Sequence, residues 1–311
     1  VLNTEEAKRG DLPSYLQAFP YVGGSLFKDK HKSPKFTSHS RQAIIDSGVL
    51  DWAAINPDIF GSMMQAVVHD ADRSSAGMHY TSVVNIMKVI EPLFLNNLYE
   101  AFEDAKGNQD KLNKLLNRIS KIKIFDPACG SGNFLIIAYK ELRRLEMKVI
   151  KEAGLLSLTG ITLDQFYGIE IDDFAHETAI LALWLTKHQI SIEFKEEFGR
   201  CKPTLPLEES ADIVCANACR IDWEKVSPKE EGDEIYIFGN PPYKGSRNQS
   251  NTQKNDMEFV FTGYKDYKKL DYISCWFHLA SNYILNTKSK FAFVTTNSIC
   301  QGEQVALLWP I

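Results

Sequence analysis

The sequence predicts an α/β protein with a mostly parallel sheet covered by helices on both faces, preceded by a helical N-terminal region. From residue 122 onward, short runs of apolar residues alternate with longer helical patterns, an alternation typical of parallel sheets. Before residue 122, the periodic segments all have helical spacing. Glycine, proline and acidic residues gather where the predicted strands end, and in parallel α/β proteins ligands bind at those ends.

The N-terminal part is predicted to contain an irregular arm followed by helices. Residues 1 to about 48 are polar and aperiodic, with several proline and glycine residues among them. Apolar residues at helical spacing predict helices over residues 58–69, 82–98 and 109–120. Pro92 lies inside the second of these, so we expect a kink or a break there. We place a domain boundary near residue 75, with the arm and helical region over 1–75 and the larger domain over 76–311.

The larger domain carries the strand–helix alternation. Short strands are predicted over residues 122–125, 166–171, 211–215, 235–238 and 291–295. Helices are predicted over residues 131–153, 173–187 and 272–285.

Composition and charge limit the class of protein. The chain has no apolar run of 18 residues, which a transmembrane helix requires, and its N-terminus lacks the features of a secretory signal. Its six cysteines show no zinc spacing, so we expect reduced thiols, a cytoplasmic protein and no metal site. The net charge of −5 is unusual for a protein that binds nucleic acid unaided. Either nucleic acid is not the substrate, or the main DNA-binding domain lies outside this chain.

The first motif, Asp-Pro-Ala-Cys-Gly-Ser-Gly, stands at the junction between a predicted strand and a helix. It contains Asp126, Ala128, Gly130 and Gly132. Two glycines so close together allow a tight turn and a close approach of the backbone to a ligand. Leu135 occupies the place of the third glycine of the dinucleotide fingerprint, which weakens the case for a pyrophosphate site.

The second motif is acidic and ends the next predicted strand. Glu170 stands at this end and is followed by Ile171. A carboxylate at this position can accept hydrogen bonds from a ribose diol. Together the two motifs predict a cofactor that contains ribose, and both nicotinamide dinucleotides and S-adenosylmethionine qualify.

The third motif, Gly-Asn-Pro-Pro-Tyr, follows a predicted strand and is the most specific. Pro241 and Pro242 fix two backbone torsions and remove two N–H donors. The side-chain oxygen of Asn240 is a further acceptor, and Tyr243 offers a flat ring. Such a set suits an amino group on a flat aromatic base.

These motifs together resemble the gamma-ordered DNA methyltransferases that modify adenine N6. The segment Gly-Met-His-Tyr-Thr-Ser at 77–82 resembles the one that precedes the glycine loop in this group. The segments 133–146 and 301–305 resemble the MmeI-like (Type IIL/IIG) restriction-modification enzymes, in which nuclease, methyltransferase and target-recognition parts share one polypeptide. The resemblance covers about residues 50 to 311 and implies the Rossmann-like fold of S-adenosylmethionine-dependent methyltransferases.

The resemblance also implies roles for individual residues. Asn240 and Pro241 would accept hydrogen bonds from adenine N6, and Pro242 and Tyr243 would complete the catalytic motif, with Tyr243 stacking on the flipped base. The implied cofactor-binding residues are Tyr80, Thr81, Asp126, Ala128, Gly130, Gly132, Glu170, Ile171, Asn217 and Trp276. Among these, Glu170 would hold the ribose, Ile171 the adenine face, Asn217 the adenine edge, and Asp126 the methionine end.

Double-stranded DNA is the implied partner, and the last strands and the target-recognition domain of the family are expected to follow residue 311. The alternatives are a nicotinamide dehydrogenase, a protein glutamine methyltransferase, an N4-cytosine methyltransferase and a non-catalytic fragment that binds DNA or cofactor. The third motif has no use in a dehydrogenase, whereas N4-cytosine enzymes more often carry serine at the position of Asn240. Residues 244–269 are rich in basic and polar side chains, so we expect a mobile loop there, poorly ordered without DNA.

Overall fold

The structure is a computed structural model, and it describes residues 8, 10–17, 35–50, 59, 81–155, 159–199 and 211–310. Most of the predicted N-terminal region lies outside these residues, including all of the helix predicted over 58–69 except Ile59. The domain boundary near residue 75 therefore stays a prediction. The irregular arm expected over residues 1 to about 48 contains two helices in its described part, α1 (Ser14–Gln17) and α2 (Ser38–Gly48), so this expectation is wrong there. A capping box at Thr37 and Ser40 starts α2, which buries none of its residues.

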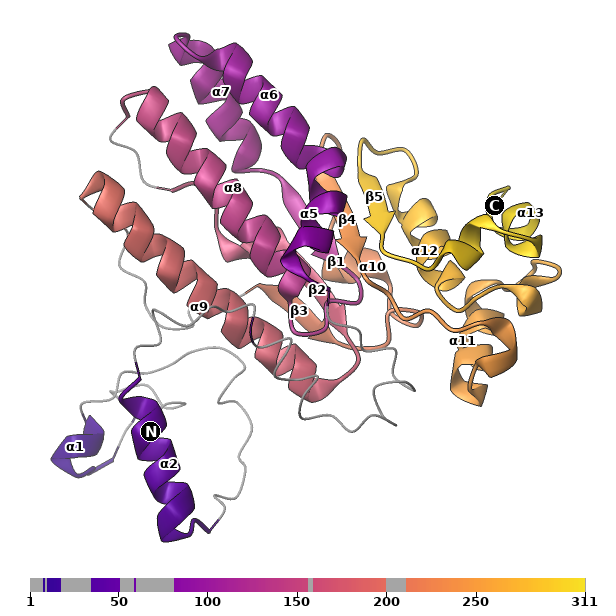
Figure 1. The fold of residues 1–311 in the computed structure, drawn as a ribbon, viewed down its shortest axis with the longest axis horizontal. Coiled ribbons are helices and arrows are strands. Elements are labelled where there is room, and N and C mark those ends of the chain that lie inside the picture. Colours follow the sequence, from indigo (N-terminus) through magenta and orange to yellow (C-terminus); the bar gives the residue numbers. More distant parts are fainter. Residues whose placement is uncertain are drawn as a thin grey trace.

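A five-stranded parallel sheet forms the centre of the molecule (Figure 1). Its strands are β1 (Lys123–Asp126), β2 (Phe166–Glu170), β3 (Asp212–Cys215), β4 (Ile235–Gly239) and β5 (Lys290–Phe293). The strand order is β3-β2-β1-β4-β5, and each neighbouring pair is parallel. The predicted fold class and the five predicted strands are confirmed. The order reverses between β1 and β4, which creates a topological switch point, and crevices at such points are where open α/β sheets bind ligands.

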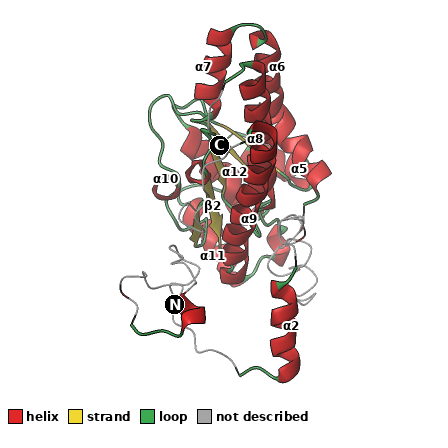
Figure 2. Cartoon of the chain, turned by 90° about the vertical axis from the view of Figure 1, so that its left-hand side faces the viewer, coloured by secondary structure: helices red, strands yellow, loops and turns green. Residues whose placement is uncertain are grey.

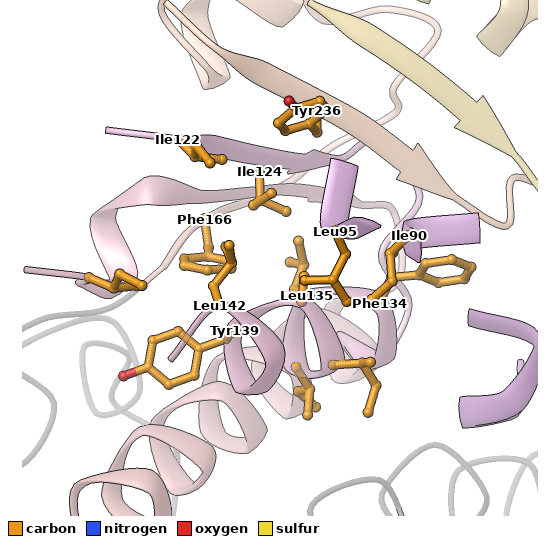
Figure 3. Close-up of a cluster of buried hydrophobic side chains, with 14 of the residues drawn as sticks. Ile90, Leu95, Ile122, Ile124, Phe134, Leu135, Tyr139, Leu142, Phe166 and Tyr236 are labelled. Atoms are coloured by element: carbon orange, nitrogen blue, oxygen red, sulfur yellow. The ribbon is translucent and has the colours of Figure 1, made fainter. Parts of the chain in front are cut away.

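The sheet separates two hydrophobic clusters because successive side chains of a strand point to opposite faces. In β1, Ile124 belongs to one cluster and Phe125 to the other. In β4, Tyr236 and Phe238 point to the face of Ile124, and Ile237 to the face of Phe125. Figure 3 shows the first cluster, where Leu135 and Tyr139 of the helix after β1 lie near Ile124 and Phe166. Burying one such side chain contributes about 1.5–3 kcal/mol.

Helices that include the two longest described ones, α8 (Asn133–Glu152) and α9 (Asp173–Phe198), cover the first face of the sheet (Figures 1 and 2). The others are α5 (Val83–Ile90), α6 (Asn96–Ala105) and α7 (Gln109–Ile119). Other helices cover or flank the second face: α10 (Trp223–Val226), α11 (Asn251–Val260), α12 (Ser274–Ile284) and α13 (Glu303–Leu308). In the part of the chain that the structure describes, no helix is long and apolar enough to cross a membrane.

Pro92 distorts the helix locally but does not break it, and the structure records a π-helical turn where a kink or a break was expected. A π-helical turn, η3 (Glu91–Leu95), joins α5 to α6, and the N–H of Asn96 donates to the carbonyl oxygen of Glu91, five residues earlier. A proline inside a helix has no N–H and its ring crowds the preceding turn. The wider turn relieves this crowding, so the helix continues through Pro92 in place of breaking.

Two predicted helix ends are wrong. The helix expected over residues 82–98 continues through α6 to Ala105. Helix α9 was expected to end near residue 187, but it continues to Phe198 because Ile190 and Phe194 extend its buried stripe. It ends at Gly199, whose φ of +73° suits glycine at a helix C-terminus.

The mobile loop expected over residues 244–269 contains helix α11 instead. Ser250 accepts a hydrogen bond from the backbone N–H of Gln253, and the Gln253 side chain accepts one from the Ser250 N–H. This reciprocal capping box satisfies two N–H groups that a helix start otherwise leaves without partners. The Ser-x-x-Gln pattern at Ser250 and Gln253 is a sequence signal for the start of a helix. The polar composition of residues 244–269 nevertheless favoured the interpretation as a loop.

Candidate active site

The three sequence motifs meet at one edge of the sheet. Asp126 ends β1, Glu170 ends β2, and Asn240 follows the last residue of β4. Because β1 pairs in parallel with both β2 and β4, these carboxyl ends lie side by side. Asp126, Glu170 and Asn240 therefore share one end of the parallel sheet, where the sequence predicted ligand-binding residues to gather. Asp126 and Asn240 lie on the two sides of the switch point.

The glycine loop of the first motif rests on the carboxylate of the second. The backbone N–H of Gly130 donates to Glu170 Oε2 at 2.8 Å. Glu170 Oε1 accepts from the N–H groups of Ile171 at 2.9 Å and Asp172 at 2.8 Å. Burial raises the pKa of Glu170, and these backbone hydrogen bonds partly oppose the rise. The loop and the acidic residue therefore form one hydrogen-bonded unit.

Gly132 begins helix α8 in a conformation that few other residues adopt. Its φ is +84°, and a Cβ atom at this position would lie 3.2 Å from the Cβ of Ala179 in α9. The glycine thus allows both the left-handed turn and the close approach of α9.

Asp126 is the most deeply buried acidic group of the site. Its side chain has no exposed surface, and Oδ1 accepts a hydrogen bond from the Ala128 N–H at 3.0 Å. Oδ2 is also buried and has no hydrogen-bond partner among the described residues. Burial, and to a smaller extent the charge of Glu170, raise the pKa of Asp126 to about 8, although the Ala128 hydrogen bond opposes this. The carboxyl group is thus largely protonated at neutral pH.

Asp126 also touches the backbone of the third motif. A Cβ atom built on Gly239 would lie 2.3 Å from Asp126 Oδ1, well inside van der Waals contact. Only glycine leaves room for the carboxyl group there. The contact joins the first motif to the third across the switch point.

Thr81 reaches the site from a distant part of the sequence. Asn240 Nδ2 donates to Thr81 Oγ1 at 3.0 Å, a contact between residues 159 positions apart. Thr81 is buried, and it directly precedes the cap of helix α5. Two predicted site residues are therefore brought together, whereas Tyr80 and the rest of the segment 77–80 lie outside the described residues.

The remaining residues of the third motif are at least partly buried. Pro241 is buried, and Pro242 and Tyr243 are half-buried. Tyr243 packs against the cluster that contains Phe125 and Ile237. This packing restricts the rotation of the Tyr243 ring. The part of the ring that stays exposed is the surface on which a base could stack.

Trp276 supports the glycine loop from the core. Its indole Nε1 donates to the carbonyl oxygen of Pro127 at 3.0 Å, and only 4% of the residue is exposed. Trp276 therefore lies on the core side of the glycine loop, within the second hydrophobic cluster. By contrast, Ile171 and Phe174 are largely exposed beside Glu170, and Ile171 is where the sequence analysis expected an apolar contact with adenine.

Asn217 belongs to a buried network that the sequence analysis missed. Its Nδ2 donates to Asp256 Oδ2 at 3.0 Å, and its Oδ1 accepts from the Cys219 N–H at 2.9 Å. Asp256 is 2% exposed, and it also accepts hydrogen bonds from Tyr272 Oη at 2.8 Å and from Arg220 Nε at 2.6 Å. Asp256 thereby ties α11 to the loop after β3. The capping-box pattern at the start of α11 was the sequence signal that could have found this residue. It predicts a helix that contains Asp256.

A family comparison agrees with this arrangement. The model of the MmeI DNA-methyltransferase domain matches residues 102–311, about two thirds of the chain. The chain belongs to this family. The matched range contains every strand of the sheet and the residues Asp126, Glu170 and Asn240.

Similar proteins cover almost the whole chain. DNA methyltransferase A of Bacillus subtilis (strain 168) is 54% identical over 312 aligned residues, which is 98% of this chain. The solved structure of the Type IIL restriction-modification enzyme MmeI in complex with DNA covers 99% of the chain with 43% identity and a TM-score of 0.90. The chain spans 36% of the first relative and 42% of the second, so it corresponds to one part of these longer proteins.

Proposed function

We propose that this chain is the catalytic domain of a restriction-modification enzyme that transfers a methyl group from S-adenosylmethionine to N6 of adenine in DNA. The observation that carries the proposal is the position of Asn240. Its amide follows β4 at the switch point and is hydrogen-bonded to Thr81, and the residue before it, Gly239, lies against the buried Asp126. Membership of the MmeI methyltransferase family supports the same reaction class.

The residues at this edge suit S-adenosylmethionine better than a dinucleotide. Glu170 can accept hydrogen bonds from ribose hydroxyls, and the exposed Ile171 provides an apolar surface for adenine. The buried Oδ2 of Asp126 has no hydrogen-bond partner among the described residues, so it can bind the ammonium group of the methionine end. The positive charge of that group would lower the pKa of the carboxyl group and favour its ionised form. A pyrophosphate, by contrast, would face two carboxyl groups here. When bound, the cofactor supplies a methyl group on a positively charged sulfur.

In the proposed mechanism, Asn240 prepares the amino group of the base. Since the amide nitrogen faces Thr81, the amide oxygen is the atom that can accept an N6–H bond. The carbonyl oxygen of Pro241 accepts the second, and the nitrogen lone pair is then less delocalised into the ring. Positive charge that develops on N6 is stabilised by the same two oxygens. A fixed dipole of this kind contributes about 3–4 kcal/mol, and no strong base is needed because the proton can leave after methyl transfer.

DNA is the proposed substrate, with the target adenine turned out of the duplex. Tyr243 would then offer its exposed ring surface for stacking. The chain has a net charge of −5, while duplex affinity depends chiefly on lysine and arginine. We therefore assign sequence recognition and most of the DNA affinity to the remainder of the longer protein.

Asn240→Ala in the full-length protein tests the proposal. We expect methylation to fall by about 10²–10³-fold, with the dissociation constant for S-adenosylmethionine close to that of the parent. Asn113→Ala, on the exposed face of α7, is the matched control and should behave as the parent.

Mass spectrometry of the nucleosides released from methylated DNA identifies the product. N6-methyladenine supports the proposal, whereas N4-methylcytosine would contradict the assignment to adenine. Methylation by Asn240→Ala at more than a few percent of the parental rate would contradict the proposed role of the amide.

A further inference from the structure

Three potential metal ligands lie together in the first turns of helix α9. Asp173, His176 and Glu177 are spaced i, i+3 and i+4, which places them on one face of a helix. One donor atom from each lies within 4.8 Å of the other two. Three neighbouring ligand groups are not by themselves evidence for a metal site. The burial and the ring orientation of His176 are a second, independent observation that points to one.

His176 is held with one ring nitrogen directed toward this group. It is 8% exposed, and its Nε2 lies 3.0 Å from the carbonyl oxygen of Ile213 in β3. A carbonyl oxygen only accepts hydrogen bonds, so Nε2 carries the proton. In the neutral ring, Nδ1 then presents its lone pair. Metal-binding histidines are commonly oriented in this way by a backbone carbonyl.

The atoms that face Nδ1 are acceptors as well. Glu177 Oε1 lies 3.2 Å from Nδ1. Among the described residues, neither His176 Nδ1 nor the buried Glu177 Oε2 makes a hydrogen bond. Two lone pairs at this distance repel each other unless a proton or a metal ion lies between them. In a tetrahedral zinc site with bonds of about 2.0–2.1 Å, two ligand atoms are about 3.3 Å apart, close to the spacing seen here.

The charge around this group also favours a cation. Asp172 lies beside it at the start of α9, and Glu170 is nearby in sequence at the end of β2. Asp172 is occupied as the helix cap, because its Oδ1 accepts the Ala175 N–H at 2.8 Å. The helix dipole disfavours a cation at this end, but the carboxylates carry full charges and outweigh it.

We propose that Asp173, His176 and Glu177 bind one Zn²⁺ ion, with a water molecule in the fourth position. An imidazole nitrogen with two carboxylates suits zinc better than magnesium or calcium, which prefer oxygen alone. This proposal is independent of the methyl-transfer function. The ion would hold the N-terminus of α9 against β3, since the His176 ring also binds the Ile213 carbonyl.

The first test measures zinc in the purified full-length protein after dialysis against trace Zn²⁺, by atomic emission. We expect Asp173→Asn and His176→Gln each to contain one Zn²⁺ fewer per chain than the parent, with affinity lowered more than about 100-fold. Asp173 is exposed, so its variant should fold normally, as circular dichroism can verify. His188→Gln on the same helix is the matched control, since His188 stacks on Trp184 away from the three ligands.

Cobalt substitution and NMR provide the second test. Co²⁺ bound to the parent should give the visible absorption of a tetrahedral centre, and Asp173→Asn should lose it. Equal zinc content in the parent and in either ligand variant would overturn the proposal. So would a nitrogen-detected NMR spectrum of the zinc-saturated parent in which both nitrogens of His176 carry protons, because a simple ion pair with Glu177 would then account for the geometry.

Discussion

Replacement of Asp126 by asparagine should change the pH dependence of stability. Burial raises the pKa of this carboxyl group to about 8 in the folded protein, against about 3.9 in an unfolded chain. Between these two pH values the folded state holds a proton that the unfolded state has released. The free energy of unfolding of the parent therefore falls as pH rises through this window. The stabilising contribution of the Asp126 carboxyl group is complete only below the pKa of the unfolded state.

The magnitude follows from the same two pKa values. Each pH unit well inside the window lowers the free energy of unfolding by about 1.4 kcal/mol. From pH 5 to 7 the free energy of unfolding of the parent should therefore fall by roughly 2.5 kcal/mol relative to that of Asp126→Asn. The difference should level off above about pH 8, where both states are ionised. The variant does not titrate there, and its amide oxygen can still accept the Ala128 N–H as Oδ1 does.

Urea unfolding at several pH values, followed by tryptophan fluorescence, measures this difference. Asp104→Asn, at an exposed position of α6, is the control and should run parallel to the parent. Parallel curves for the parent and Asp126→Asn between about pH 5 and 7 would refute the reasoning, because Asp126 would then be ionised in the folded state.

Further substitutions test other contacts of the site. Glu170→Ala should weaken binding of S-adenosylmethionine about ten- to hundredfold in calorimetry, as expected for the loss of a hydrogen bond to a charged group; an unchanged dissociation constant would remove Glu170 from the site. Gly239→Ala should lower the free energy of unfolding by about 1–3 kcal/mol because its Cβ would overlap Asp126 Oδ1. The same change should cost less in an Asp126→Ala background, and equal costs would rule out the contact. Trp276→Phe should cost about 1–3 kcal/mol in urea unfolding because the Pro127 carbonyl loses its donor, and a neutral effect would mean that this bond does not stabilise the loop.

The sequence by itself determined the fold class and the location of the site. Strands and helices were readable because side-chain periodicity is a local property: Ile124 and Phe125 alternate between two faces, and the helix after Gly132 buries one stripe from Leu142 onward, after a first part that is buried on all sides. Parallel strands then require Asp126, Glu170 and Asn240 to share an edge. No long-range information was needed for this step, since the chain order of strand, motif and helix implies it.

The tertiary structure alone decided what surrounds each of these residues. The Asn240–Thr81 hydrogen bond joins segments 159 residues apart, and no periodicity or spacing encodes it. Asp126 has a raised pKa because β4 and the loop enclose it, and Gly239 is required because of that carboxyl group. The orientation of His176 depends in the same way on a carbonyl of β3. Burial, electrostatics and close contact arise between distant segments, so they appear only when the sheet brings those segments together.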